Sequence, residues 1–128
     1  MTIDRQFATE FALQWISNWN ARRVEDVLSH FREDCDFESP IAATLTNTAR
    51  LHGKEALRKH WKEALARINS LHFVLEAYLW DQQERTLTVI YRSRIDGRIT
   101  SCLELMQFDP DGKQTYGRAY YGATQSCR

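Results

Sequence analysis

Residues 14–40 read Gln14-Trp-Ile-Ser-Asn-Trp-Asn-Ala-Arg-Arg-Val-Glu-Asp-Val-Leu-Ser-His-Phe-Arg-Glu-Asp-Cys-Asp-Phe-Glu-Ser-Pro40, and this stretch decides the fold. It contains the end of an aromatic helix, a short second helix and an acidic segment that becomes extended over residues 36–39. Pro40 stops that segment, because proline fixes φ and lacks the amide hydrogen that a helix or a strand ladder needs. The order of helix, helix and strand is therefore set here.

Apolar side chains recur at helical spacing around this stretch. The stripe from Ile3 to Trp19 predicts a long helix, and Asn20 can end it because asparagine tolerates the left-handed conformation. A shorter stripe predicts a second helix over residues 23–31. Residues 41–52 are polar and without periodicity, which predicts a loop and leaves open whether it acts as a lid.

The second half of the chain changes period. A third helix is predicted over residues 54–68, and from Leu71 the apolar residues alternate with a period of two. Asp96-Gly97 is a two-residue hairpin signal, and Asp109-Pro-Asp-Gly112 is a second turn. The predicted strands cover residues 71–80, 86–95, 98–109 and 113–123. Helices followed by a meander predict an α+β fold, with three N-terminal helices packed on a curved antiparallel sheet in one domain over residues 1–128.

Composition excludes several classes of protein. The 128 residues carry 17 basic and 17 acidic side chains, so no basic surface suggests a nucleic-acid partner. Cys35, Cys102 and Cys127 form no close pair and no metal-binding spacing, which is typical of a reducing compartment. The N-terminus lacks a signal-peptide core, and no apolar run approaches the roughly 20 residues that span a bilayer. We therefore expect a cytoplasmic protein without membrane contact.

The order of several short motifs resembles the nuclear transport factor 2-like superfamily, especially its SnoaL-like cyclases and ketosteroid isomerases. The resemblance implies a cystatin-like, cone-shaped α+β barrel with a pocket between helices and sheet. It also implies a homodimer formed through the outer faces of the sheets. Activities vary widely on this fold, so the fold alone does not set the reaction. The matching residues are Trp15…Trp19-Asn20-Ala21, Val24…Val27-Leu28…Phe31…Asp34, Phe37…Pro40, His52-Gly53…Ala56-Leu57…Trp61, Glu104…Phe108-Asp109…Gly112 and Tyr121-Gly122.

The isomerases of this fold use an aspartate base, a tyrosine and a carboxylic acid, and the resemblance places these roles on Ser39, Trp15 and Glu104. Serine does not accept a proton at neutral pH without an activating partner. Trp15 keeps a donor but is bulkier than tyrosine. Glu38 is shifted by one residue and so points to the opposite face of the sheet. Ordinary ketosteroid isomerisation is therefore not expected.

Glu104 is the candidate catalytic residue. Strand alternation places it on one face with Cys102, Met106 and Phe108, and leucines flank it in the sequence. A carboxylate in apolar surroundings needs a partner or a raised pKa. It can then donate a proton to a ligand, or it can simply bind a tryptophan N–H or an arginine as a structural group, or face water.

Further candidates line the pocket that the resemblance implies, the strand residues by the same alternation and the helix tryptophans by their level along the family's pocket. Tyr116, Arg118 and Tyr120 fall on the outer face of the last strand, which suits an interface. Trp19 is expected to fill the core, and Trp15 and Trp61 either do the same or form pocket walls. His60 is able to reach the rim, but a surface position is the expectation, and no histidine has metal-binding spacing. The predicted pocket residues are Trp15, Phe37, Ser39, Trp61, Tyr91, Cys102 and Tyr121.

The sequence leaves two functions open. The first is binding of an apolar, steroid- or polyketide-like molecule, with isomerase, cyclase or dehydratase activity by acid–base chemistry that uses no cofactor or metal. This requires a cavity of roughly 300 Å3 or more. The second is a non-catalytic dimeric module that binds a ligand or a protein, and the missing aspartate favours it.

Overall fold

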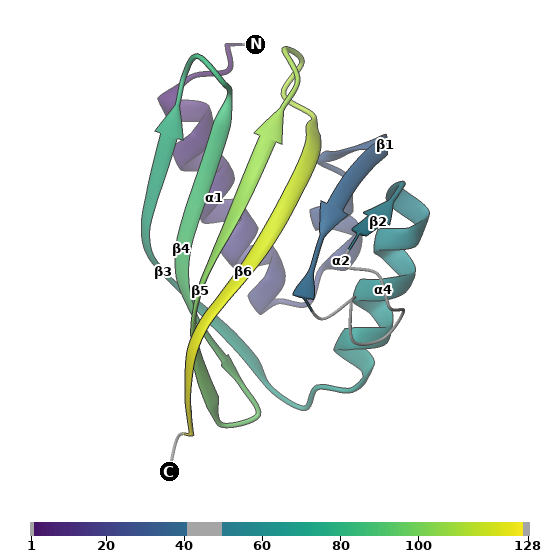
Figure 1. Cartoon of the computed structure of the whole chain (residues 1–128), viewed down its shortest axis with the longest axis vertical. Helices are drawn as coiled ribbons and strands as arrows, with labels where there is room; N and C mark the ends of the chain where they lie inside the picture. Colours follow the sequence, from purple (N-terminus) through teal and green to yellow (C-terminus); the bar gives the residue numbers. More distant parts are fainter. Residues whose placement is uncertain (1, 41–49, 127–128) are drawn as a thin grey trace.

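The computed structural model describes residues 2–40 and 50–126. Helices lie on one side of a curved sheet, with the N-terminal helix behind the long strands and another helix beside the short ones (Figure 1). The α+β class is thereby confirmed. The elements are α1 (Arg5–Asn20), α2 (Val24–Leu28), β1 (Phe31–Glu38), β2 (Arg50–His52), α4 (Lys54–Ala66), β3 (Leu71–Asp81), β4 (Thr86–Ile95), β5 (Arg98–Phe108) and β6 (Gln114–Ser126).

The sheet contains the expected antiparallel meander of β3, β4, β5 and β6, and it also contains one parallel pair that was not expected. Its strand order is β2-β1-β6-β5-β4-β3, and β1 pairs parallel with β6. Phe37 stands opposite Gly117 in that pair, and a Cβ at Gly117 would lie 2.7 Å from the Phe37 ring. Glycine thus lets the two strands and this ring pack closely.

Several boundaries differ from the prediction. The second helix is shorter than expected, and the chain is already extended at Phe31. Residues 50–52, expected in a loop, form β2 and pair with β1. Residues 41–49, where a lid was left open, lie outside the described residues.

Helix α1 is tied to the sheet at its end. The left-handed residue that follows it is Arg22, with a φ of 58°, and not Asn20 as the sequence suggested. The Asn20 side chain instead accepts a hydrogen bond from the Phe73 amide at 2.6 Å and donates one to the Phe73 carbonyl at 3.0 Å. This amide therefore fixes the end of α1 against β3.

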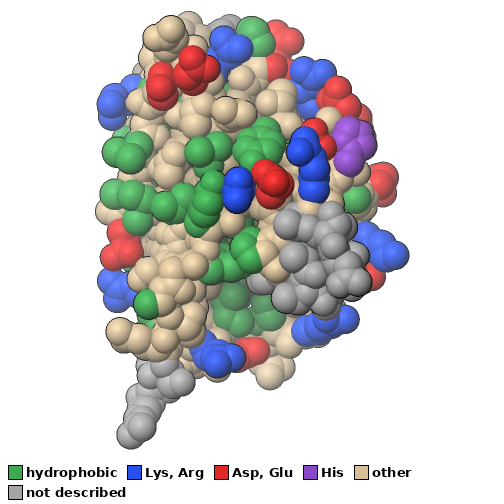
Figure 2. Space-filling view, in the orientation of Figure 1, with side chains coloured by type: hydrophobic (Ala, Val, Ile, Leu, Met, Phe, Trp, Pro, Cys, Tyr) green, Lys and Arg blue, Asp and Glu red, His purple; other side chains and the backbone are tan. Residues whose placement is uncertain are grey.

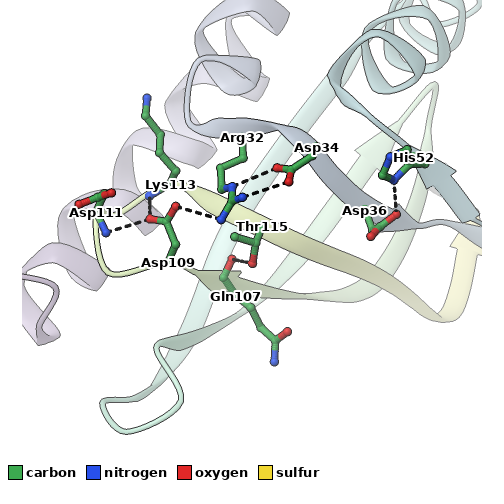
Figure 3. Close-up of polar contacts among 9 residues, drawn as sticks. All are labelled: Arg32, Asp34, Asp36, His52, Gln107, Asp109, Asp111, Lys113 and Thr115. Carbon is green, nitrogen blue, oxygen red and sulfur yellow. Dashed lines mark hydrogen bonds and ion pairs between the residues drawn. The ribbon is translucent and has the colours of Figure 1, made fainter.

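Both predicted turns are present. Asp96 and Gly97 have φ values of 49° and 83°, as the hairpin between β4 and β5 requires. At the turn before β6, the Asp109 carboxylate accepts hydrogen bonds from the Asp111 and Lys113 amides, both at 2.9 Å (Figure 3). Arg32 of β1 reaches the same carboxylate at 3.6 Å, so this turn also holds β1 near β6.

None of the described helices is long and apolar enough to cross a bilayer.

Candidate functional site

A cavity of about 90 Å3 lies between the helices and the inner face of the sheet. Side chains of α1, α4 and strands β1, β3, β4, β5 and β6 line it. It is smaller than the roughly 300 Å3 that we expected from the sequence. An adjoining hollow of about 370 Å3 shares Ser39, Ala119 and Tyr121 with the cavity, and these residues therefore mark its mouth.

Glu104 projects from the middle of β5 into this cavity. Its side chain is buried, with 7% of its surface exposed, and burial raises its pKa to about 8. None of the described residues forms a hydrogen bond or an ion pair with its carboxyl group, so the expected bridge to a tryptophan N–H is not formed. Every fully buried side-chain oxygen of the described residues has a hydrogen-bond partner. The Glu104 oxygens have none, so they keep some accessible surface, and they line the cavity. At neutral pH it is a protonated acid with a free hydrogen-bonding face.

Three aromatic side chains from α1, β3 and β4 form one wall. Trp15 meets Tyr91 edge-on with ring centroids 5.1 Å apart, and Phe73 stacks against Trp15 at 5.9 Å. Edge-on and tilted contacts of this kind hold rings in fixed orientations. Burial and the nearby charge of Glu104 raise the pKa of Tyr91, so its hydroxyl stays protonated.

A second aromatic group covers the other side. Trp61 of α4 packs edge-on against Trp19 of α1 at 5.1 Å and against Phe37 of β1 at 5.4 Å. All three rings line the cavity and also belong to the hydrophobic core. Trp19 therefore has both roles, whereas the sequence suggested core filling alone.

Ser39 and Tyr121 lie at the mouth. Ser39 directly follows β1 and is buried. Its side chain hydrogen bonds with that of Tyr121. The Tyr121 side chain keeps 42% of its surface exposed, while burial of its hydroxyl and then the Glu104 charge raise its pKa. The Tyr121 ring thus faces outward and its hydroxyl inward.

Cys102, a predicted pocket residue, is not among the side chains that line the cavity. It lies on the same sheet face as Glu104, but its thiol points back to the Thr100 carbonyl at 3.5 Å. Burial raises the pKa of this thiol to about 11, so it remains protonated and unreactive. Cys127 lies outside the described residues.

His60 is the functional candidate that the sequence placed wrongly. It was expected at the surface, but it is buried, with 8% exposed, and lines the cavity from α4. The signal for this was the apolar stripe of the helix, since His60 lies three residues after Leu57 and four before Ala64. Other lining residues not singled out from the sequence are Ala64, Leu65, Ile68, Leu71, Phe73 and Ile95.

The outer face of the sheet carries the residues that alternation assigned to it. Tyr116 hydrogen bonds to Glu38, and the Arg118 guanidinium lies 4.8 Å above the centre of the Tyr120 ring. Glu38 therefore points away from the cavity. His52 and Asp36, bonded at 2.8 Å, lie farther along β1 and β2 (Figure 3).

Within residues 2–40 and 50–126, no three histidine, cysteine or acidic side chains come together as a metal site.

Solved structures with the same fold include a protein of unknown function and two named as enzymes. A SnoaL-like protein of unknown function from Burkholderia thailandensis is 32% identical over 96% of this chain and 100% of its own, with a TM-score of 0.83. SalBIII, an epoxide hydrolase/cyclase-like enzyme of pyran ring formation in the polyether salinomycin, is 15% identical over 94% of each chain, with a TM-score of 0.77. BvnE pinacolase from Penicillium brevicompactum is 18% identical over 91% and 86%, with a TM-score of 0.75.

No protein of curated function matches the sequence. A family model described as a SnoaL-like domain, however, matches residues 12–119. This match covers both sides of the cavity, from Trp15 of α1 to Ala119 of β6. The chain therefore belongs to the SnoaL-like family.

Proposed function

We propose that this protein binds a small, neutral, largely apolar molecule in the cavity and transforms it by acid–base chemistry without a cofactor. The reaction class is that of an isomerase, cyclase or dehydratase, and the ligand is steroid-like or polyketide-like. The observation that carries the proposal is Glu104, a buried carboxyl group without a hydrogen-bonding partner among the described residues that opens into an aromatic cavity. Membership of the SnoaL-like family supports it.

Glu104 acts in this proposal as a general acid. Because burial raises its pKa to about 8, it holds a proton near neutral pH and donates it to a ligand oxygen. The low polarity of the walls strengthens that hydrogen bond relative to one in water. Tyr91 and Tyr121 also line the cavity, and burial followed by the Glu104 charge raises the pKa of each, so their protonated hydroxyls are further donors for a ligand.

The size of the cavity limits how a ligand binds. A volume of about 90 Å3 accommodates one reacting ring or functional group rather than a whole steroid-sized molecule. The remainder of a larger ligand would extend past Ser39 and Tyr121, which line the cavity. We therefore place the reacting oxygen at Glu104 and the rest of the ligand at the mouth.

Thermal-shift measurements on a panel of steroids, polyketides and aromatic ketones test the proposal. The wild-type protein should be stabilised by at least one class, and the variant Glu104→Gln should lose any turnover of that compound by about 100-fold or more. The matched control is Glu84→Gln, which alters an exposed carboxylate in the turn before β4. A panel without any stabilising compound, or a Glu104→Gln variant with full turnover, contradicts the proposal.

The second candidate is a non-catalytic ligand-binding module. Ser39 favours it, because this serine stands where related isomerases have a catalytic base. The module binds the same ligands but releases them unchanged. Mass spectrometry of a ligand recovered after long incubation separates the two, since only the enzyme returns an isomerised, cyclised or dehydrated product.

We also propose a homodimer formed through the outer face of the sheet. The large side chains on that face include Val74, Leu79 and Tyr120, which are all exposed. Figure 2 shows hydrophobic side chains gathered in a band across this side of the molecule. Exposed apolar patches of this kind are typical of association surfaces.

A further inference from the structure

The cavity contains a second titratable group that faces it from the opposite layer. Glu104 belongs to β5 in the sheet, whereas His60 belongs to α4 in the helical layer. A ligand between the two layers is therefore able to contact both side chains at once. This arrangement places a proton donor and a proton acceptor on different sides of one reacting molecule.

His60 is free to act on a ligand. Among the described residues it forms no hydrogen bond and no ion pair, although it is buried. Every fully buried side-chain nitrogen of the described residues has a hydrogen-bond partner. Since the His60 ring nitrogens have none, they must keep some accessible surface. A histidine that served only to hold the core together would be expected to bond to a neighbouring backbone or side-chain group.

Its surroundings also keep the imidazole neutral. Burial lowers the pKa of His60, and the Glu63 carboxylate on the same helix opposes this only in part. The groups that face it across the cavity are Glu104, Tyr91 and Tyr121, all of which are uncharged near neutral pH. A neutral imidazole has one ring nitrogen without a proton, and this nitrogen accepts a proton from a ligand.

The described lining of the cavity contains no lysine or arginine. An anionic ligand would have no positively charged partner there, and burying an unpaired ion costs on the order of several kcal/mol. A neutral molecule with an oxygen that accepts a hydrogen bond from Glu104 has no such cost. A ketone meets both conditions.

We propose that His60 is the base that works with Glu104, and that the pair enolises a small neutral ketone. This proposal rests on the acid–base function proposed above. It explains how acid–base chemistry is possible although serine replaces the aspartate base at position 39, because the base is supplied by α4 and not by the end of β1.

In the forward step, a His60 ring nitrogen removes a proton from the carbon next to the carbonyl. The electron pair of that C–H bond forms the carbon–carbon double bond of the enol. The carbonyl π electrons move to oxygen, which takes the proton from Glu104. The products are an enol, an imidazolium and a carboxylate. The imidazolium then returns its proton to a carbon of the enol system while the enol O–H returns its proton to the Glu104 carboxylate, which restores both residues. On an unsaturated ketone, protonation at the far carbon shifts the double bond.

Hydrogen–deuterium exchange tests this step without knowledge of the natural ligand. Cyclohexanone serves as the probe in D2O, and loss of its α-hydrogen signal is followed by NMR. Wild-type protein should accelerate this loss above the buffer rate. His60→Gln and Glu104→Gln should each lower the protein-dependent rate by about 100-fold or more. The control His72→Gln changes an exposed histidine on β3 and should match the wild type.

Two measurements separate a chemical role of His60 from a structural one. Free imidazole should restore exchange in His60→Ala, which a purely structural histidine would not permit. Cyclohexanone should also shift the ring signals of His60, but not those of His72, in the wild-type spectrum. These signals report on contact even if both His60 variants fold poorly.

The outcomes distinguish the two proposals. If Glu104→Gln loses exchange while His60→Gln keeps the wild-type rate, His60 is not the base and the proposed function stands. Ring signals of His60 that stay unchanged on addition of cyclohexanone would likewise exclude His60 as the base. If wild-type protein neither binds cyclohexanone nor accelerates exchange, the proposal that this pair enolises ketones is wrong. Stabilisation of the protein by another class of compound in the thermal-shift panel would still support the proposed function.

Discussion

The carboxyl group of Glu104 binds its proton more tightly in the folded chain than in the unfolded one, because burial raises its pKa from 4.5 to about 8. Between these two pH values the folded state holds more protons than the unfolded state. The contribution of Glu104 to stability is therefore largest below pH 4.5 and falls as pH rises through about 8. The same burial that makes Glu104 an acid thus makes the fold weaker at alkaline pH.

Denaturant unfolding of the wild type and Glu104→Gln at pH 5, 7 and 9 measures this effect. Glutamine has no titrating proton, so the variant should gain stability relative to the wild type as pH rises. The gain between pH 5 and pH 9 should approach about 3–5 kcal/mol. Glu84→Gln controls for the loss of a surface carboxylate and should show no such trend. A difference between wild type and Glu104→Gln that stays constant with pH contradicts a buried, protonated Glu104.

At the scale of elements, Asn20 joins α1 to β3. Its side chain makes two hydrogen bonds to the Phe73 backbone, and Phe73 in turn supports Trp15 in the cavity wall. The contact thus positions the helix that carries one side of the site. Loss of the amide would leave both Phe73 backbone groups without these partners.

We expect Asn20→Ala to lower the free energy of unfolding by about 1–3 kcal/mol, because part-buried backbone groups lose their partners. Asn69→Ala is the matched control, since Asn69 is exposed in the segment between α4 and β3. Urea unfolding at neutral pH provides the comparison. An Asn20→Ala variant as stable as Asn69→Ala would show that the link between α1 and β3 does not depend on this side chain.

The sequence predicted the elements well where a local pattern determines them. Alternation in β4, β5 and β6 placed Tyr91, Glu104 and Ala119 on one face, because successive residues of a strand point to opposite sides. The parallel pairing of β1 with β6 was not predicted, because it joins segments from opposite ends of the chain and leaves no local period. The start of β1 was missed for a related reason, since its first half is polar and exposed.

The site shows the same division between local pattern and tertiary packing. Tyr91 followed from strand alternation, whereas the family resemblance offered Trp15 and Trp61 as pocket walls, and all three line the cavity. His60 was not predicted there, because a polar residue at the edge of an apolar stripe is usually exposed, and its burial arises from the tertiary packing of α4 against α2, β1 and β2. The volume of the cavity depends on how several aromatic rings pack together, which no local pattern specifies.

At the scale of the whole molecule, the outer face of the sheet lacks any covering helix among the described residues (Figure 1). Two rows of paired residues cross it. Ala77, Ile90, Leu103 and Tyr120 form one row, and Leu79, Thr88, Leu105 and Arg118 form the next. The first row is largely apolar, whereas the second combines two leucines with Thr88 and Arg118. Charged pairs such as Arg92 with Glu76 lie toward the edge of this face, as at the polar rim of an interface.

The proposed dimer predicts that a new charge at the β3 end of these rows separates the subunits. Leu79→Arg should convert the protein to a monomer in sedimentation-velocity experiments, because each interface buries two unpaired guanidinium groups next to apolar side chains. Leu13→Arg is a close control, since Leu13 on α1 is 61% exposed and Leu79 is 63% exposed. It should leave the dimer intact. Dissociation by Leu13→Arg but not by Leu79→Arg would show that the interface lies on α1. A wild-type protein that is monomeric at the same concentration would contradict the proposed dimer.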